Sequence, residues 1–198
     1  MATCTRCAKE IGGFETISVT GRGDFCYACY NDDLIQDGFE DFDNAKLDPV
    51  VLEDADGVAH TFAIQSLIVP TGHGMKAVEV RDGEARGYVF EILGDFGDDA
   101  LVLFGKLYQR MRAGLAQRHI ERGAYGWELT DAARIVGRIE ADLDDPDGLP
   151  LLVVDGKELT WEEVGRMLKS SEGFTLEMAV KDSIEVVGGP LLEEARAK

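Results

Sequence analysis

The residues best suited to chemistry in this chain are its four cysteines: Cys4, Cys7, Cys26 and Cys29. They form two Cys-x-x-Cys pairs separated by 18 residues, and the chain contains no other cysteine. A Cys-x-x-Cys turn presents two thiolates from one side, so two such turns supply the four soft ligands of a tetrahedral zinc site. Two disulfides, or a four-cysteine iron site, are the competing explanations. The closed ligand set favours one structural zinc ion.

The rest of the composition indicates the compartment and the kind of partner. The N-terminus has no basic segment followed by an apolar stretch, so we expect no signal peptide and a cytoplasmic location, where paired cysteines bind metal rather than form disulfides. No run of about 18 apolar residues is present, so no membrane span is expected. The formal charge of −18 disfavours binding to nucleic acid or to an anionic membrane. A protein is therefore the expected partner, and the sequence does not indicate an oligomeric state.

The residues around the cysteines predict a zinc-finger module over residues 1–38. The first pair lies in a short knuckle, residues 14–20 predict a strand that turns back at Gly21–Gly23, and the second pair opens a helix that continues to Gln36. This order is similar to that of a treble-clef zinc finger. The spacing resembles that of the zinc-binding head of the Clp unfoldase ATPase, which implies a protein partner, and is close to that of GATA fingers, which implies DNA. Residues 1–30 contain three basic and three acidic residues, a balance that favours the protein partner.

Downstream of the zinc-finger module, the chain predicts an α+β fold in four parts. Residues 39–49 are rich in acids and end in a proline, which is typical of a linker. Residues 50–122 contain short alternating segments separated by Asp-Gly turns, and they predict an antiparallel meander followed by a long amphipathic helix. Residues 123–188 predict a ββαβ part, and residues 189–198 predict a flexible tail.

Two patterns locate the helices within these parts. A helix is predicted over residues 98–121 because apolar residues recur at intervals of three and four. The predicted buried stripe consists of Leu101, Phe104, Tyr108, Met111 and Leu115. Thr160 and Glu163 have the spacing of a capping box, which predicts a second helix start. Alternating apolar residues predict a last strand over residues 174–180.

No catalytic motif accompanies the cysteine pattern. None of the three histidines, His60, His73 and His119, belongs to an H-E-x-x-H motif. The motifs G-x-S-x-G and G-x-x-x-x-G-K-[ST] are absent as well. His73 lies between two glycines in the segment Pro70–Gly74, where a loop could bring the backbone close to a ligand. The sheet face and the loop at His73 are therefore kept as an alternative site, for a small ligand or an enzymatic reaction.

A second resemblance concerns the rest of the chain. The remainder of the chain after the zinc-finger module, and residues 155–174 above all, is similar to a family of uncharacterised bacterial zinc-containing proteins, and that resemblance implies no activity. The leading hypothesis is thus a zinc-stabilised protein-interaction or adaptor protein of unknown pathway. A small-ligand-binding domain or enzyme that uses the loop at His73 is the alternative. A nucleic-acid-binding regulator comes third because of the negative charge.

Overall fold

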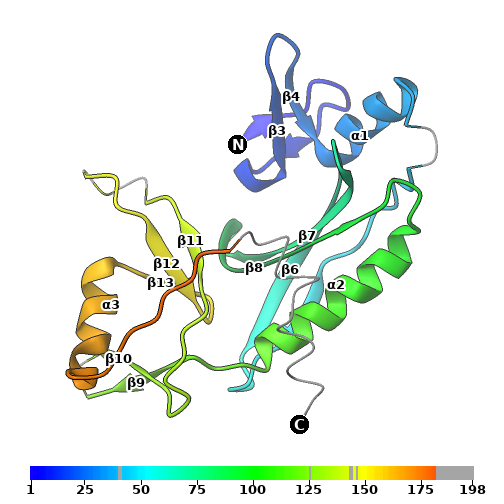
Figure 1. Ribbon diagram of the computed structural model, residues 1–198. Coiled ribbons are helices and arrows are strands. Elements are labelled where there is room, and N and C mark those ends of the chain that lie inside the picture. The colour runs from blue at the N-terminus through cyan, green and yellow to red at the C-terminus, as the bar shows by residue number, and fades with distance from the viewer. Residues whose placement is uncertain (40–41, 125, 143–144, 146, 182–198) are drawn as a thin grey trace. The chain divides into compact units, whose positions relative to one another are not determined.

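The structure is a computed structural model, and it describes residues 1–198 except 40–41, 125, 143–144, 146 and 182–198. The chain divides into two compact units, residues 1–114 and 115–198. Each unit combines helices with antiparallel strands (Figure 1), so the predicted α+β class is confirmed. None of the described helices is long and apolar enough to cross a membrane.

The first unit begins with the segment predicted to be a zinc-finger module, residues 1–38, which is built from two small hairpins and a helix. In chain order its elements are β1 (Ala2–Thr3), β2 (Glu10–Ile11), the 3₁₀ helix η1 (Gly13–Glu15), β3 (Thr16–Val19), β4 (Gly23–Cys26) and α1 (Tyr27–Gln36). β1 pairs with β2 and β3 pairs with β4, both antiparallel. The predicted strand, glycine turn and helix are all present, and α1 follows β4 without an intervening loop.

A four-stranded antiparallel sheet forms the rest of this unit together with one helix. Its strands are β5 (Val50–Glu53), β6 (Ala59–Val69), β7 (Gly72–Arg81) and β8 (Glu84–Gly94), in that spatial order. The turn between β7 and β8 has Asp82 and Gly83 both at positive φ, which is the conformation that an Asp-Gly hairpin turn requires. β6 and β7 are longer than the apolar segments predicted, because their pairing continues to Val69 opposite Gly72.

Helix α2 (Ala100–Leu115) follows the sheet, and its residues Leu103 and Gly114 lie close to Gly94 and Phe90 of β8. Asp99 and Asp43 accept hydrogen bonds from the backbone N–H groups of its first turn. Its buried residues are Ala100, Leu103, Leu107, Met111 and Leu115. The predicted stripe was therefore wrong at Leu101, which is 64% exposed, and the predicted end at residue 121 was too late. The buried stripe follows the contact with β8, where Gly114 lies so close to Phe90 that a Cβ would be 2.5 Å from its ring.

The described residues of the second unit form two small sheets, one α-helix and one 3₁₀ helix. Its elements are β9 (Ile120–Gly123), β10 (Gly126–Leu129), β11 (Arg138–Glu140), β12 (Leu151–Val154), β13 (Lys157–Leu159), α3 (Trp161–Met167) and the 3₁₀ helix η2 (Leu168–Ser171). β9 pairs with β10, and β11, β12 and β13 form a three-stranded sheet in that order. The predicted capping box is present, since Thr160 and Glu163 exchange hydrogen bonds at the start of α3.

Three features of the second unit differ from the prediction or lie outside it. The hairpin β9–β10 was not predicted. The strand expected at 174–180 is absent, because residues 175–181 have no regular secondary structure. An isolated alternating segment becomes a strand only when a neighbouring strand pairs with it. The predicted tail, residues 189–198, lies outside the described residues.

Candidate metal centre

The four cysteines come together from the two hairpins and the first turn of α1. Cys4 and Cys7 flank the knuckle after β1, Cys26 is the last residue of β4, and Cys29 lies in the first turn of α1. The four sulfur atoms all lie within 4.8 Å of one another, and the Sγ atoms of Cys7 and Cys26 are 4.0 Å apart. All four thiols are free. The structure thus brings together the complete set of residues predicted from the sequence.

This spacing fits a tetrahedral thiolate site. With metal–sulfur bonds of about 2.3 Å, the corners of a ZnS₄ tetrahedron are roughly 3.8 Å apart. Sulfur atoms 4.0 Å apart are close to that distance and far beyond a disulfide bond of about 2.05 Å. A metal ion held by all four thiolates has no open position for a substrate. The donor set therefore fits a structural site.

The knuckle that holds the first pair is fixed by backbone hydrogen bonds. The N–H of Cys4 donates to the carbonyl of Lys9 at 2.9 Å, and the N–H of Ala8 donates to the carbonyl of Cys4 at 2.9 Å. Ala8 has φ 58°, so the turn accepts a left-handed conformation that is unfavourable for alanine. The N–H of Thr5 donates to the carbonyl of Asp24 at 2.7 Å. That last bond attaches the knuckle to β4, which ends in the second pair.

Arg6 connects the knuckle that carries the first cysteine pair to helix α1, which carries Cys29. Its guanidinium donates to the carbonyl of Cys29 at 3.3 Å and also pairs with Asp33 on α1. Arg22, from the β3–β4 turn, pairs with the other oxygen of Asp33 at 2.6 Å. The knuckle, the β3–β4 hairpin and α1 are therefore joined by one carboxylate that accepts from two arginines. These bonds hold the segments that carry the cysteines close together around the sulfur cluster.

Burial and nearby backbone N–H groups shift the pKa of the cysteine thiols in opposite directions. Burial raises the pKa of Cys4, but the N–H groups of Cys7, Cys26 and Arg6 point at its sulfur and bring the pKa down to about 6. Burial raises the pKa of Cys26 and of Cys29. The Cys4 sulfur adds to the increase for Cys26, against bonds from Cys29 that lower it, and the other three sulfurs all add to the increase for Cys29. One thiolate forms readily, whereas further thiolates beside it repel one another. A bound cation removes that repulsion, which is the chemical role that a metal ion would have here.

The histidine proposed as an alternative site is buried. His73 is the second residue of β7 and is 0% exposed. Its Nε2 lies 2.8 Å from the hydroxyl of Ser66, and its ring packs against Phe42 with the ring centroids 4.3 Å apart and the planes tilted by 50°. Its Nδ1 has no hydrogen-bond partner among the described residues. Burial lowers the pKa of His73 and keeps the ring neutral. The predicted loop is therefore a strand, and its histidine faces the protein interior.

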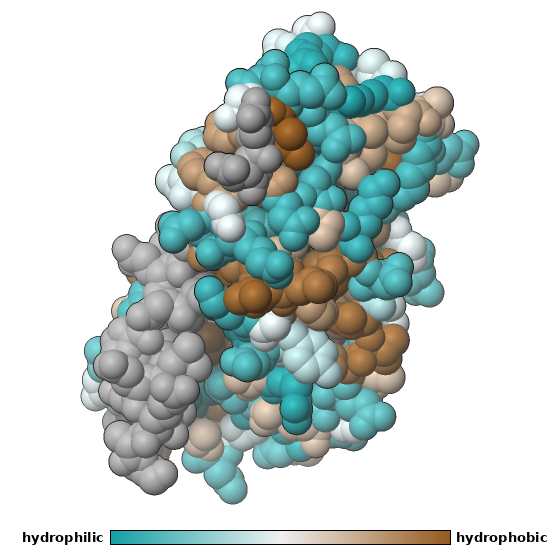
Figure 2. Space-filling model, turned by 90° about the vertical axis from the view of Figure 1, so that its right-hand side faces the viewer, coloured by the Kyte–Doolittle hydropathy of each residue, from teal (hydrophilic) through white to brown (hydrophobic). Residues whose placement is uncertain are grey.

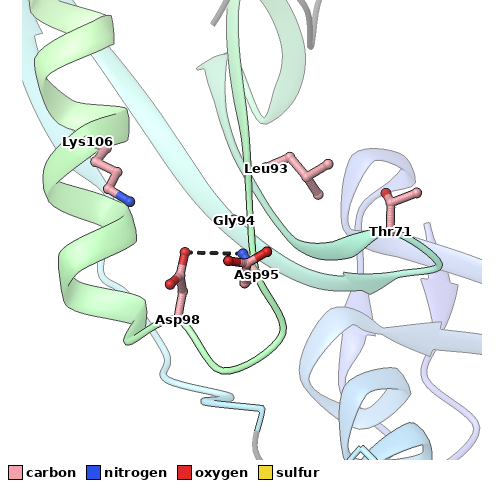
Figure 3. Close-up of a pocket in the computed structure, with 6 residues that line it drawn as sticks. All are labelled: Thr71, Leu93, Gly94, Asp95, Asp98 and Lys106. Atoms are coloured by element: carbon pink, nitrogen blue, oxygen red, sulfur yellow. Dashed lines mark hydrogen bonds between the residues drawn. The ribbon is translucent and has the colours of Figure 1, made fainter. Parts of the chain in front are cut away.

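A pocket does lie beside this end of the sheet, but His73 is not in its lining. The pocket has a volume of about 290 Å³ and is lined by Thr71, Leu93, Gly94, Asp95, Asp98 and Lys106. Figure 3 shows Lys106 reaching from α2 toward the loop that holds the two aspartates. The N–H of Asp95 already donates to Asp98 at 3.2 Å. The pocket is open, and its titratable residues are exposed or half-buried: Asp95, Asp98 and Lys106.

His60, the second histidine on the sheet, belongs to a buried ionic network. Its Nδ1 lies 2.7 Å from Glu79 and its Nε2 lies 3.0 Å from Asp54. Glu79 also accepts from Arg81 and from the N–H of Tyr88. Burial opposes ionisation of Glu79, but the bonds from Arg81 and His60 outweigh it and lower its pKa. With both ring nitrogens used in the protein interior, His60 has a structural role.

Asn31 was not predicted, yet it joins the zinc-finger module to the sheet. β5 pairs only with residues 59–62 of β6, so the outer edge of β6 beyond Phe62 has no strand partner among the described residues. The amide nitrogen of Asn31 donates to the carbonyl of Ser66 at 2.9 Å, and its oxygen accepts from the N–H of Ile68 at 3.1 Å. The side chain thus pairs with β6 as a strand backbone would, and it is fully buried. The sequence predicted only that Asn31 lies in a helix.

Comparison with known families divides the chain close to the boundary between its two compact units. Residues 43–116 match a domain of unknown function, DUF7686, and residues 119–185 match another, DUF7713. No curated protein and no solved structure matches the chain. The four cysteines lie outside both matched segments. The chain is therefore similar to two families that have no assigned activity, and the sulfur cluster is the feature from which a function can be argued.

Proposed function

We propose that this protein is a zinc-stabilised protein-interaction or adaptor protein, with a treble-clef-like zinc finger at residues 1–38. The observation that supports it most is the group of four free sulfurs within 4.8 Å of one another. The order knuckle, hairpin and ligand-bearing helix fits a treble clef. Thiolates bind zinc in a reducing compartment, so we also propose a cytoplasmic location.

The choice of a protein as partner follows from the surface. The chain has a formal charge of −18, which repels phosphate backbones. Figure 2 shows a face on which hydrophilic residues surround a smaller band of hydrophobic ones. Such a mixture suits a protein partner, because interfaces combine an apolar centre with a polar rim. A small-ligand or enzymatic role at the loop of His73 is less well supported, since that histidine is fully buried.

The metal is tested by elemental analysis of the full chain, purified without added metal. We expect about one zinc per chain and no iron. Cys7→Ser should lose most of the zinc, and because Cys7 is exposed its replacement opens no cavity. Ser18→Ala is the matched control, since its hydroxyl bonds only Asp24 at 2.6 Å in the same module. Full zinc content in the Cys7→Ser variant, or iron in the parent protein, would contradict the assignment.

The adaptor role is tested by affinity capture followed by reconstitution. The zinc-loaded chain and the Ser18→Ala control should retain the same proteins, and the Cys7→Ser variant should not. A retained protein should then bind the purified chain in titration calorimetry, with a weaker affinity for the Cys7→Ser variant. If no protein distinguishes the zinc-loaded chain from this variant, the interaction role of the zinc finger is wrong even when zinc is present.

A further inference from the structure

The second unit has a row of apolar side chains that stay exposed among the described residues. After Gly173, which has φ +89°, the segment 174–181 continues without regular secondary structure. Its exposed apolar residues alternate along the chain: Phe174 is 81% exposed, Leu176 60%, Met178 64% and Val180 74%. A spacing of two places all four on one face of an extended strand. The match to DUF7713 continues to residue 185, so this segment belongs to the matched domain.

The three-stranded sheet of the same unit has an edge that suits such a strand. β11 is the edge strand of the order β11-β12-β13 in the described residues. Ile139 of β11 pairs with Leu152, which packs into the core formed with α3, yet Ile139 itself is 50% exposed. Ile135 packs against the same core just before β11. The apolar face of the sheet therefore extends to β11, and no further strand pairs with β11 among the described residues.

We propose that segment 174–180 of a second copy of this chain adds to the edge of β11 as an antiparallel strand. The exchange is reciprocal, so that each copy donates one strand and accepts one around a two-fold axis. The occupant is a second copy because donor and acceptor are complementary, and in its own chain the segment stays exposed and unpaired with β11 among the described residues. Pairing of this kind also covers an open edge strand, which folded proteins otherwise protect.

Side-chain size and charge select one register. When Leu176 lies opposite Ile139, Met178 lies opposite Gly137 and Val180 lies opposite Ile135. Gly137 has no side chain, and Leu152 and Val154 already fill the position that its Cβ would take, so the backbone there is flat and the two aliphatic pairs extend the apolar face on either side of it. In the same register Glu177 lies opposite Arg138, on the other face of the sheet. Opposite charges in directly facing positions favour this register over one shifted by a single residue.

The test measures the oligomeric state of the full chain by light scattering and sedimentation at a series of concentrations. We expect a concentration-dependent dimer, and Leu176→Asp should weaken it at least tenfold. Leu101→Asp is the matched control, since Leu101 is 64% exposed in the other unit and the change is the same. Hydrogen exchange should show protected amides at residues 175–180 in the dimer only.

A charge exchange tests the register itself. Glu177→Arg and Arg138→Glu should each weaken the dimer, and the double variant should restore most of its affinity. A chain that stays monomeric at all concentrations overturns the proposal, and so does a monomer whose residues 175–180 are protected, because the strand then pairs within its own chain. A dimer that Leu176→Asp does not weaken overturns it equally. Far-UV circular dichroism checks that each variant is folded.

Discussion

The substitution Asn31→Ala tests how the zinc-finger module is held to the sheet. It removes three hydrogen bonds: two donated by the amide nitrogen, to Ser66 and Asn44, and one accepted from Ile68. Each lost bond costs about 0.5–1.5 kcal/mol net, and a buried group left unsatisfied costs about 1–3 kcal/mol. The Ser66 carbonyl and the Ile68 N–H face the interior, so we expect a loss of about 3–5 kcal/mol in the unfolding free energy of the first unit.

The measurement is urea and thermal unfolding of the zinc-loaded chain, followed by circular dichroism. For a unit of this size, 1 kcal/mol corresponds to roughly 3–5 °C, so its transition should fall by about 10–20 °C. Gln109→Ala is the control, because Gln109 is an exposed amide on α2 and its removal should change the free energy by less than about 0.5 kcal/mol. Hydrogen exchange adds a local readout, since the amide of Ile68 should exchange faster in the Asn31→Ala variant. A loss below about 1 kcal/mol with unchanged exchange at Ile68 would refute the reasoning.

Other predictions concern acid, glycines and metal. The folded state lowers the pKa values of Asp54 and Glu79 below 3.8 and 4.5, because bonds from His60 to Asp54, and from Arg81 and His60 to Glu79, outweigh burial. Their contribution to stability is present above 4.5 and is lost as the pH falls through the lowered values, so the first unit should lose stability as the solution is acidified from pH 4.5 downward. A flat profile in urea titrations across this range would contradict it. Gly87→Ala should cost about 2–4 kcal/mol, since φ is +91° and a Cβ would overlap the Glu79 carboxylate. Gly105→Ala, whose Cβ would meet nothing within 4 Å, should stabilise α2 by up to about 1 kcal/mol; thermal unfolding should show opposite signs for the two glycines. Removing the metal with a chelator should speed exchange of the Ile68 amide, and unchanged exchange would show that the module and the sheet are independent.

The sequence predicted those features whose physical cause is local. The cysteine cluster follows from the spacing of two pairs, because a short turn fixes both sulfurs of each pair. The Asp-Gly turn at Asp82 and the capping box at Thr160 depend on residues within four positions of each other. In each case the backbone conformation is determined by neighbours in the chain. Such patterns were read correctly without knowledge of the fold.

The features that the sequence did not reveal depend on partners far along the chain. The buried stripe of α2 is set by its contact with β8, and so Leu101 is exposed although it fits a helical period. His73 was expected in a loop because glycines flank it, but the ladder between β6 and β7 extends through it. The alternation at residues 174–180 predicted a strand, but no strand in the described part of the chain pairs with it. Periodicity indicates which residues can be buried, and tertiary contacts decide which of them are.

Helix α1 connects the metal centre to the sheet because it presents a ligand and an edge-pairing group on different sides. Cys29 and Asn31 are two residues apart, which is about 200° around a helix, so one points to the sulfur cluster while the other points to β6. The binding free energy of a metal in such a module is also folding free energy. Metal binding that orders the first turn of α1 therefore also positions Asn31 against Ser66 and Ile68. On this argument the zinc-finger module protects an open edge of the sheet, and the cysteines stabilise more of the chain than the residues that surround them.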